Sequence, residues 1–165
     1  SKSRIIHDVI KHAKKGGLIL GICNGFQILI ETKLLPGVLL RNKKLRFLSK
    51  NVFLKALNIN NQFCLNFKKK SIIKLPIAHN EGNYFADNKI LQNLEDNNLI
   101  AFKYCDEKGN INKDSNPNGS SNNIAGIFNS NKNILGMMPH PERLIDPILS
   151  GEDGSMIFES LLKSQ

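Results

Sequence analysis

The ten residues Leu-Ile-Leu-Gly-Ile-Cys-Asn-Gly-Phe-Gln, 18–27, indicate the fold class, because a short apolar run changes there into a helical pattern. Leu18–Ile22 is wholly apolar, which is typical of a strand buried on both faces of a parallel sheet. Gly25–Leu35 is expected to form a helix that ends before Pro36-Gly37. Another amphipathic helix is expected just ahead of the strand. Helix, buried strand, tight turn and helix in this order are typical of an α/β fold.

The remainder of the chain predicts further elements around this unit. Runs in which apolar and polar residues alternate are typical of half-solvated antiparallel strands. The expected strands are Arg46–Leu57, Gln62–Phe67, Ser71–Ala78, Leu99–Tyr104, Ile124–Phe128 and Asn133–Met138. The expected helices run from a capping Ser3 to about Lys15, over Lys89–Glu95, and onward from Ser150–Asp153 with Met156, Ile157, Leu161 and Leu162 facing the core. Asp106–Asn123 is expected to be a loop, and we expect a single domain over residues 1–165.

The charge balance is basic, with 23 Lys and Arg against 14 Asp and Glu and a net charge of +9. Such an excess can indicate a nucleic-acid partner. Its clusters, 41–46 and 68–70, lack interleaved aromatic residues and any zinc-finger or RNA-binding signature. We therefore favour solvated basic faces and expect no nucleic acid, while an acidic partner or a phosphorylated substrate stays open as an alternative.

The three cysteines Cys23, Cys64 and Cys105 are widely spaced and form no CxxC pair. We therefore expect neither a disulfide framework nor a metal site, and a reducing, cytoplasmic location. No apolar run approaches the length of a membrane span, so no membrane association is expected. Cys64 and Cys105 lie in strand patterns and are expected in the core, whereas His7 and His12 are expected on a solvated helix face.

Cys23 is the candidate nucleophile. It lies on the expected turn from strand to helix, between Gly21 and Gly25, and such a turn requires small neighbours because its backbone is crowded. The N-terminus of the following helix is expected to lower the thiol pKa and to favour the thiolate. The backbone N–H of Asn24 is a candidate oxyanion donor. The G-x-C-x-G pattern alone fits a small buried residue at a strand end equally well.

A base for this thiol is expected in Met-Pro-His-Pro-Glu-Arg, residues 138–143. His140 follows a predicted strand, where an α/β sheet presents its site. Glu142 is placed to orient the imidazole and to stabilise its cation. The flanking prolines stiffen the backbone around His140.

Together these motifs resemble those of class I glutamine amidotransferases, whose nucleophile motif G-x-C-x-G-x-Q is matched by Gly21, Cys23, Gly25 and Gln27. More narrowly, the chain is similar over its whole length to the glutaminase subunits of phosphoribosylformylglycinamidine synthase. The segments that carry this likeness are Asn24 and Phe26, 35–37, 41–42, 78–83, 116–120, 124–126 and 135–143.

The resemblance implies an open, doubly wound, mostly parallel sheet flanked by helices, with added antiparallel strands. It implies hydrolysis of L-glutamine through a thioester on Cys23. The ammonia would pass to a large synthetase subunit that converts formylglycinamide ribonucleotide to the amidine with ATP and Mg, beside a small third subunit. No cofactor or metal is expected on this chain, and no phosphate-binding loop is visible. Asn24, Gln27, Asn118, Gly119 and Ser120 are the expected substrate-binding residues.

The sequence departs from this family in two places. The family has a strand and a glycine-rich loop ahead of the first helix, and the loop supplies a second oxyanion donor. We therefore expect the chain as given to be N-terminally incomplete, poorly stable alone and nearly inactive. Asn80 also stands where the family has glycine, within a segment whose His79 and Glu81 either shape the pocket or the partner contact or are structural.

Two other functions stay open from the sequence. One is a class I amidotransferase of another biosynthetic pathway, which the Cys23 turn and the His140–Glu142 pair also fit. The other is a non-enzymatic binding module that uses the basic surface.

Overall fold

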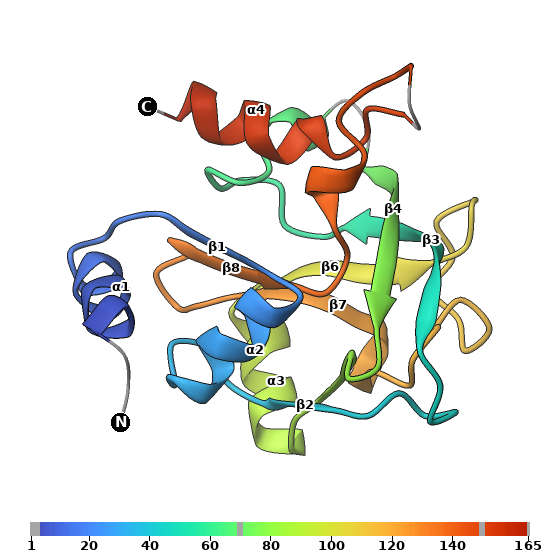
Figure 1. The fold of residues 1–165 in the computed structure, drawn as a ribbon, viewed down its shortest axis with the longest axis horizontal. Coiled ribbons are helices and arrows are strands. Elements are labelled where there is room, and N and C mark those ends of the chain that lie inside the picture. The colour runs from blue at the N-terminus through green and yellow to red at the C-terminus, as the bar shows by residue number, and fades with distance from the viewer. Residues whose placement is uncertain (1–3, 69–70, 149–150, 165) are drawn as a thin grey trace.

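The computed structural model describes residues 4–68, 71–148 and 151–164 and shows an α/β fold (Figure 1). Its helices are α1 (Arg4–Lys14), α2 (Asn24–Glu31), α3 (Asn88–Asp96) and α4 (Ser155–Lys163), with short 3-10 turns η1 (Leu65–Lys68), η2 (Ser121–Asn123) and η3 (Pro141–Arg143). Its strands are β1 (Ile19–Ile22), β2 (Val38–Leu40), β3 (Leu48–Ala56), β4 (Ile72–His79), β5 (Asn83–Phe85), β6 (Ile100–Cys105), β7 (Ile124–Phe128) and β8 (Ile134–Met137).

The main sheet of the described residues has the order β1-β8-β7-β6-β3-β4, and β2 pairs with β5 in a separate two-stranded sheet. The prediction of an α/β fold with flanking helices and added antiparallel strands is confirmed. The described sheet is mixed and not mostly parallel as expected: β1 and β8 pair in parallel, and its other four ladders are antiparallel. Parallel pairing needs a long crossover, whereas the short connection between β7 and β8 permits only an antiparallel hairpin.

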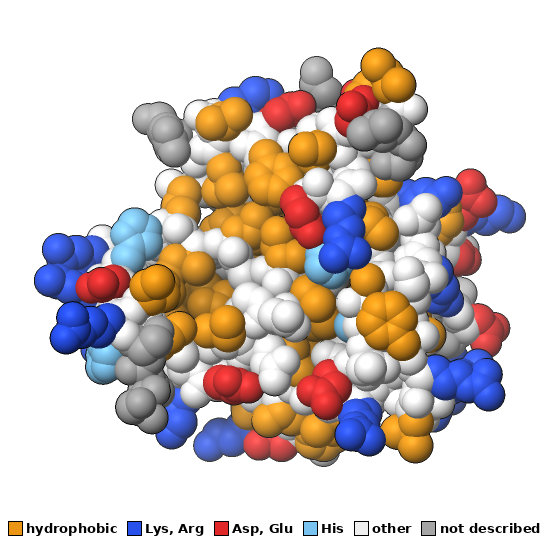
Figure 2. Space-filling view, viewed as in Figure 1, with side chains coloured by type: hydrophobic (Ala, Val, Ile, Leu, Met, Phe, Trp, Pro, Cys, Tyr) orange, Lys and Arg blue, Asp and Glu red, His pale blue; other side chains and the backbone are white. Residues whose placement is uncertain are grey.

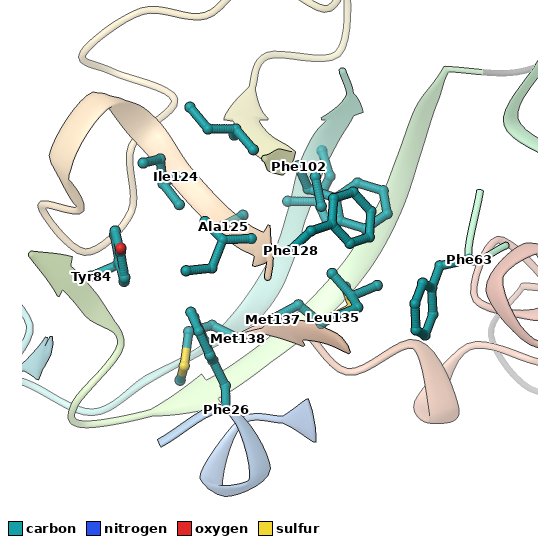
Figure 3. Packing of buried hydrophobic residues seen from close by; sticks show 14 of the residues in the cluster. Phe26, Phe63, Tyr84, Phe102, Ile124, Ala125, Phe128, Leu135, Met137 and Met138 are labelled. Atoms are coloured by element: carbon teal, nitrogen blue, oxygen red, sulfur yellow. The ribbon is translucent and has the colours of Figure 1, made fainter. Parts of the chain in front are cut away.

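Helix α2 positions the candidate site because it packs on β1 and β8 directly after the Cys23 turn. Its Phe26 is fully buried and stacks on Tyr84, with ring centroids 5.9 Å apart. Figure 3 shows Phe26 and Tyr84 beside Met137 and Met138, which come from the end of β8. A single aromatic cluster thus joins the first helix after Cys23 to the strand that leads to His140.

The surface in Figure 2 has hydrophobic side chains across its centre, and many of the Lys and Arg side chains lie toward its periphery. Helix α1 contributes several of the cations, and it contacts the rest of the fold through an apolar face of which Ala13 is buried. None of the helices in the described part of the chain is both long enough and apolar enough to cross a bilayer.

Two expected elements are wrong in the structure. Gln62–Phe67 is not a strand, because Asn61 accepts a hydrogen bond from the Phe63 N–H at 2.9 Å and turns the chain into η1. Phe63, Cys64 and Phe67 are buried there as core residues of a turn. Leu162 does not face the core: it is 72% exposed, whereas Ile157 of the same helix is fully buried.

Several smaller outcomes complete the comparison. The short strands β2 and β5 were not expected, and η2 interrupts the expected loop 106–123. The remaining predicted strands and helices are confirmed, with their ends shifted by a few residues. Ser3 and Ser150, expected at helix starts, lie outside the described residues.

Asn133 generates a prediction about how α1 is held, because its buried amide donates to the Ala13 and Gly17 carbonyls at 3.0 and 2.9 Å. Asn133→Ala removes both donors and leaves carbonyl groups unsatisfied, so the free energy of unfolding should fall by about 1–3 kcal/mol. Denaturant titration followed by circular dichroism measures this change. The exposed Asn97→Ala serves as control and should stay within about 0.5 kcal/mol, and equal effects of the two would contradict the assignment.

Candidate active site

The parallel pairing of β1 with β8 brings the two candidate catalytic segments to one edge of the sheet. The register joins Ile22 to Met137, and the Cys23 N–H donates to the Met137 carbonyl at 2.9 Å. Cys23 follows β1 at once, and His140 follows β8 after two intervening residues. Cys23 has a φ of 52°, a conformation that costs a non-glycine residue energy and that accumulates at functional sites.

The two glycines beside Cys23 have different importance in the structure. A Cβ on Gly21 would lie 2.3 Å from the Leu29 side chain and 2.9 Å from the Gly25 carbonyl group. A Cβ on Gly25 would meet no atom within 4 Å. The expectation that the turn requires a small residue therefore holds for Gly21, where α2 crosses closely, and is wrong for Gly25.

His140 and Glu142 form a hydrogen-bonded pair, with His140 Nδ1 2.5 Å from Glu142 Oε1. The 3-10 turn η3, which has Pro141 at its first position, brings the carboxylate back to the ring. The His140 side chain is 8% exposed, and its backbone N–H donates to the Pro76 carbonyl at 2.8 Å. Because the carboxylate only accepts, Nδ1 carries the proton and Nε2 is left as an acceptor. That Nε2 is buried and has no hydrogen-bond partner among the residues that the structure describes.

The Cys23 thiol lies in a half-buried position, with Sγ 3.9 Å from the Ala78 carbonyl and 4.0 Å from Asn24 Oδ1. Burial raises the thiol pKa above its ordinary value, and this effect exceeds the opposing effects of the Asn24 N–H and the Arg143 charge. The backbone N–H at the start of α2 thus lowers the thiol pKa as expected, but burial outweighs it and the net shift is upward. The thiol keeps its proton, so its attack on a carbonyl requires a base.

Cys23 differs from the other two cysteines in its surroundings. Burial raises the pKa of Cys64 to about 12 and that of Cys105 to about 11, and both are almost fully buried in the core. Cys23 lines a pocket, whereas Cys64 and Cys105 are buried, which confirms the expectation of core positions for those two.

A pocket of about 550 Å³ brings four of the eight expected site residues together, namely Cys23, Asn24, Gln27 and His140. This volume lies in the range of small-molecule sites. Its walls are formed by Ile22, Cys23, Asn24, Gln27, Phe47, Ala78, His79, Asn80, Glu81, Met138, His140 and Arg143. Gln27 lies one helical turn beyond Cys23, and its Nε2 donates to Glu31 at 3.0 Å. Glu142 is not among the lining residues, but it contacts two that are, His140 at 2.5 Å and Arg143 at 3.5 Å.

Asn118, Gly119 and Ser120 were expected at the rim of this pocket, and the structure places them elsewhere. Asn118 is fully buried and donates to the Gly82 carbonyl at 2.6 Å, and the Ser120 hydroxyl donates to Asn118 Oδ1 at 2.6 Å. The side chains of Asn118 and Ser120 are thus engaged in hydrogen bonds within the protein, and both donate to the Gly82 carbonyl in the turn after β4. They are not among the residues that line the pocket.

Asn42 is a residue of the site region for which sequence reasoning found no role, and it organises the pocket wall. It is 1% exposed, and its Nδ2 donates to the Arg46 and His79 carbonyls at 2.8 Å each. Its Oδ1 accepts from the Gly82 N–H at 3.1 Å and contacts His79 Nδ1 at 3.0 Å. Its only sequence signal was its place beside Arg41 in a segment typical of the family.

His79 is held as a neutral imidazole in the pocket wall. Because both hydrogens of the Asn42 amide are already donated, Asn42 Oδ1 accepts from Nδ1–H and leaves His79 Nε2 as a buried, unpartnered acceptor. Burial lowers the His79 pKa to about 4. Glu81 is more exposed, with Oε1 3.9 Å from Arg41 Nε.

Metal chemistry has no visible site in this region. In the described stretches 4–68, 71–148 and 151–164, no three His, Cys, Asp or Glu side chains gather in a way that could hold a metal ion. What the geometry does assemble is a thiol at a strained turn, an imidazole with a carboxylate partner, and a backbone N–H beside the sulfur. Those parts define a thiol-based acyl-transfer site.

Comparison with known proteins agrees with this class. Residues 1–152 match the family described as the CobB/CobQ-like glutamine amidotransferase domain. A solved glutamine amidotransferase from Thermotoga maritima shares the fold, with a TM-score of 0.56 at 16% identity over 96% of this chain and 66% of the other. The fold and the site thus define a glutamine amidotransferase.

More similar relatives give the particular family. The PurQ subunit of phosphoribosylformylglycinamidine synthase from Pelagibacter ubique is 59% identical over 99% of this chain and 72% of the relative. That from Gloeobacter violaceus is 49% identical over 98% and 70%. The structure of PurLQS from Thermotoga maritima matches with a TM-score of 0.83 at 37% identity, over 99% of this chain and 69% of that one. The chain belongs to the PurQ family, the PurQ subunits of phosphoribosylformylglycinamidine synthase.

The two glycines at the turn give a matched pair of variants. Gly21→Ala should lower the free energy of unfolding by about 1–3 kcal/mol, because the new methyl group collides with Leu29 and with the Gly25 backbone. Gly25→Ala should change it by less than about 1 kcal/mol, since the site is open and alanine favours the helix. Urea unfolding of both variants measures the difference, and similar losses would show that the two positions are equally crowded.

His79 gives a prediction about stability against pH. Its pKa is about 4 in the folded chain and 6.5 ordinarily, so between these values the unfolded state binds more protons. The free energy of unfolding should therefore decrease as pH falls from about 6.5 to about 4, by on the order of 2 kcal/mol from this group. The free energy of unfolding, measured by denaturant titration at several pH values across this range, should depend less on pH in His79→Gln than in the wild type. The exposed His7→Gln should keep the wild-type slope, and a slope unchanged in His79→Gln would exclude His79 as its source.

Proposed function

We propose that this chain hydrolyses L-glutamine to glutamate and ammonia with Cys23 as nucleophile, His140 as base and acid, and Glu142 as the residue that orients His140. The observation that carries the proposal is the convergence of the Cys23 turn and the His140–Glu142 pair in one pocket, from the ends of two paired parallel strands. Membership in the PurQ family agrees with this chemistry.

The reaction follows from the protonation states of the free site. His140 Nε2, which is an unpartnered acceptor, takes the thiol proton as Sγ attacks the side-chain carbonyl carbon of glutamine. The Asn24 N–H, which lies close enough to the sulfur to lower the thiol pKa, is placed to stabilise the oxyanion. Protonated His140 then donates to the leaving nitrogen, so that ammonia departs and a thioester remains. Water, deprotonated by His140, hydrolyses the thioester and releases glutamate.

Glu142 contributes to these reaction steps through the imidazole ring of His140. Its carboxylate fixes the Nδ1–H tautomer and stabilises the imidazolium that forms in both proton transfers. Asn24 and Gln27 line the pocket and belong to the proposed binding surface for glutamine. Asn118, Gly119 and Ser120 keep an indirect part in the proposal, since they support the turn after β4.

The remaining parts of the proposal concern the assembly. The solved relative is a PurLQS complex, and we place this chain in an equivalent complex with a large synthetase subunit and a small third subunit. ATP and Mg would be bound by the synthetase partner, with no cofactor on this single amidotransferase domain. Three unpaired thiols, one at the site and two in the core, support a reducing cytoplasm.

Replacement of the nucleophile tests the proposal. In the intact protein assembled with its partners, Cys23→Ala should lower glutamine-dependent synthesis at least about 10³-fold and leave ammonia-dependent synthesis within about twofold of wild type. His140→Asn should act in the same direction, and Cys105→Ala is the cysteine control. The measurement is amidine formation with either nitrogen source. Glutamine use that survives in Cys23→Ala would remove Cys23 from the mechanism.

Labelling gives an independent readout of the nucleophile and the substrate together. A glutamine-mimicking diazoketone should form one adduct, on Cys23, that peptide mass mapping locates and that L-glutamine blocks. Labelling of Cys64 or Cys105 instead would contradict the assignment.

A further inference from the structure

The segment 41–47 is a surface that the proposed chemistry does not use. Six of its seven side chains are exposed, and Asn42 is the buried exception. The exposed side chains are those of Arg41, Lys43, Lys44, Leu45, Arg46 and Phe47. Four cations and two large apolar groups thus stand together on one short connection between β2 and β3.

The exposure of this segment is built into the fold. The buried Asn42 side chain donates hydrogen bonds to the Arg46 and His79 carbonyls, and the Asn42 backbone N–H donates to the Asn80 carbonyl at 2.8 Å. The Lys43 N–H donates to the Asn118 carbonyl at 2.9 Å, and the Leu45 N–H donates to the Asn42 carbonyl at 2.7 Å. The side chains are therefore presented on a fixed backbone, which lowers the entropy cost of binding.

Leu45 is the most informative residue of the segment. Its φ of 51° lies in the left-handed region, which a leucine adopts at an energetic cost and an asparagine or glycine far more readily. Its side chain is 76% exposed, so little packing within the chain offsets that cost. A strained backbone that presents an apolar side chain to solvent is an arrangement that an external contact would stabilise.

Phe47 connects this surface to the pocket. It is 59% exposed and also lines the pocket that contains Cys23. A molecule that covers Leu45 and Phe47 would therefore lie against a residue that lines the pocket.

The charges indicate the chemistry of that molecule. The segment carries four cations, and the ion pair that the described residues form with it joins Arg41 to Glu81 at 3.9 Å. A net positive surface is complementary to an acidic one. A nucleic acid would use the cations but not the two apolar groups between them, and one phenylalanine does not form a stacking series. The combination favours a protein.

We propose that segment 41–47 is the surface on which the synthetase partner docks, through an acidic face around an apolar recess that receives Leu45. The proposal rests on the proposed function, because it takes the synthetase as the acceptor of ammonia. Docking there covers Phe47, which lines the pocket. Docking there is also coupled to the pocket wall, because the Asn42 side chain hydrogen-bonds both to Arg46 of the segment and to His79.

Leu45→Asn in the intact protein tests this surface, because asparagine accepts the left-handed backbone but lacks the apolar side chain. Affinity for the purified synthetase partner, with the small third subunit present, should fall at least about tenfold by isothermal titration. The melting temperature should stay the same or rise. The matched control is Leu162→Asn on α4, where leucine is 72% exposed, and it should bind within about twofold of wild type. Unchanged affinity in Leu45→Asn, or equal losses in both variants, would overturn the proposal.

The charges are tested separately by association kinetics. Lys44→Glu with Arg46→Glu should slow association and reduce its dependence on salt, because the cations steer an acidic partner. Lys14→Glu with Lys15→Glu on and after α1 is the matched control and should leave both unchanged. Loss of RNA binding with undiminished synthetase binding would assign the surface to nucleic acid and overturn the proposal. Diazoketone labelling of Cys23 in the wild type reports on the proposed function independently, so the two can fail separately.

Discussion

Four residue pairs join β1 to β8 in parallel, and the hydrogen bond from the Cys23 N–H to the Met137 carbonyl extends this ladder by one step. Parallel strands place their carboxyl ends at the same edge of a sheet. Whatever follows β1 and whatever follows β8 must therefore lie close together. The same hydrogen bond holds the strained conformation of Cys23, while Gly21 allows α2 to leave the turn at once. The nucleophile and its base owe their proximity to this one pairing.

The far edge of the sheet completes the site. The order β1-β8-β7-β6-β3-β4 puts β4 five places from β1, and β4 nevertheless contacts both catalytic segments. Its Pro76 carbonyl accepts from the His140 N–H, and its Ala78 carbonyl lies 3.9 Å from the Cys23 sulfur. The sheet must curl for both contacts to form, and Figure 1 shows β4 passing across the ends of the other strands. Antiparallel strands that seemed peripheral in the sequence thus form one wall of the pocket.

The sequence was informative where a local pattern has one physical solution. The apolar run 18–22 correctly predicted a strand, but its expected burial on both faces is wrong, because Gly21 alone of β1 is buried among the described residues. The short turn between β7 and β8 could only make a hairpin. Sequence reasoning failed where individual side-chain hydrogen bonds, which an apolar–polar pattern does not display, decide the course of the backbone. The hydrogen bond to the Asn61 side chain makes 62–67 a turn and not a strand. Buried hydrogen bonds hold the side chains of Asn118 and Ser120 in the interior and not at the rim of the pocket. Asn42 escaped notice because its side chain bonds to three residues, Arg46, His79 and Gly82, two of which lie far along the chain.

In the two histidines of the pocket, the hydrogen-bond partner of Nδ1 determines whether Nε2 can accept a proton at low energetic cost. In His79 and His140 alike, Nδ1–H donates to a fixed side-chain oxygen and Nε2 is a buried acceptor. The oxygen belongs to a neutral amide for His79, and burial then keeps that ring uncharged by lowering its pKa to about 4. The oxygen belongs to a carboxylate for His140, which offsets the charge of an imidazolium. Since burial also keeps the Cys23 proton on sulfur, proton transfer must accompany attack, and only the ring with the carboxylate can accept that proton at low cost.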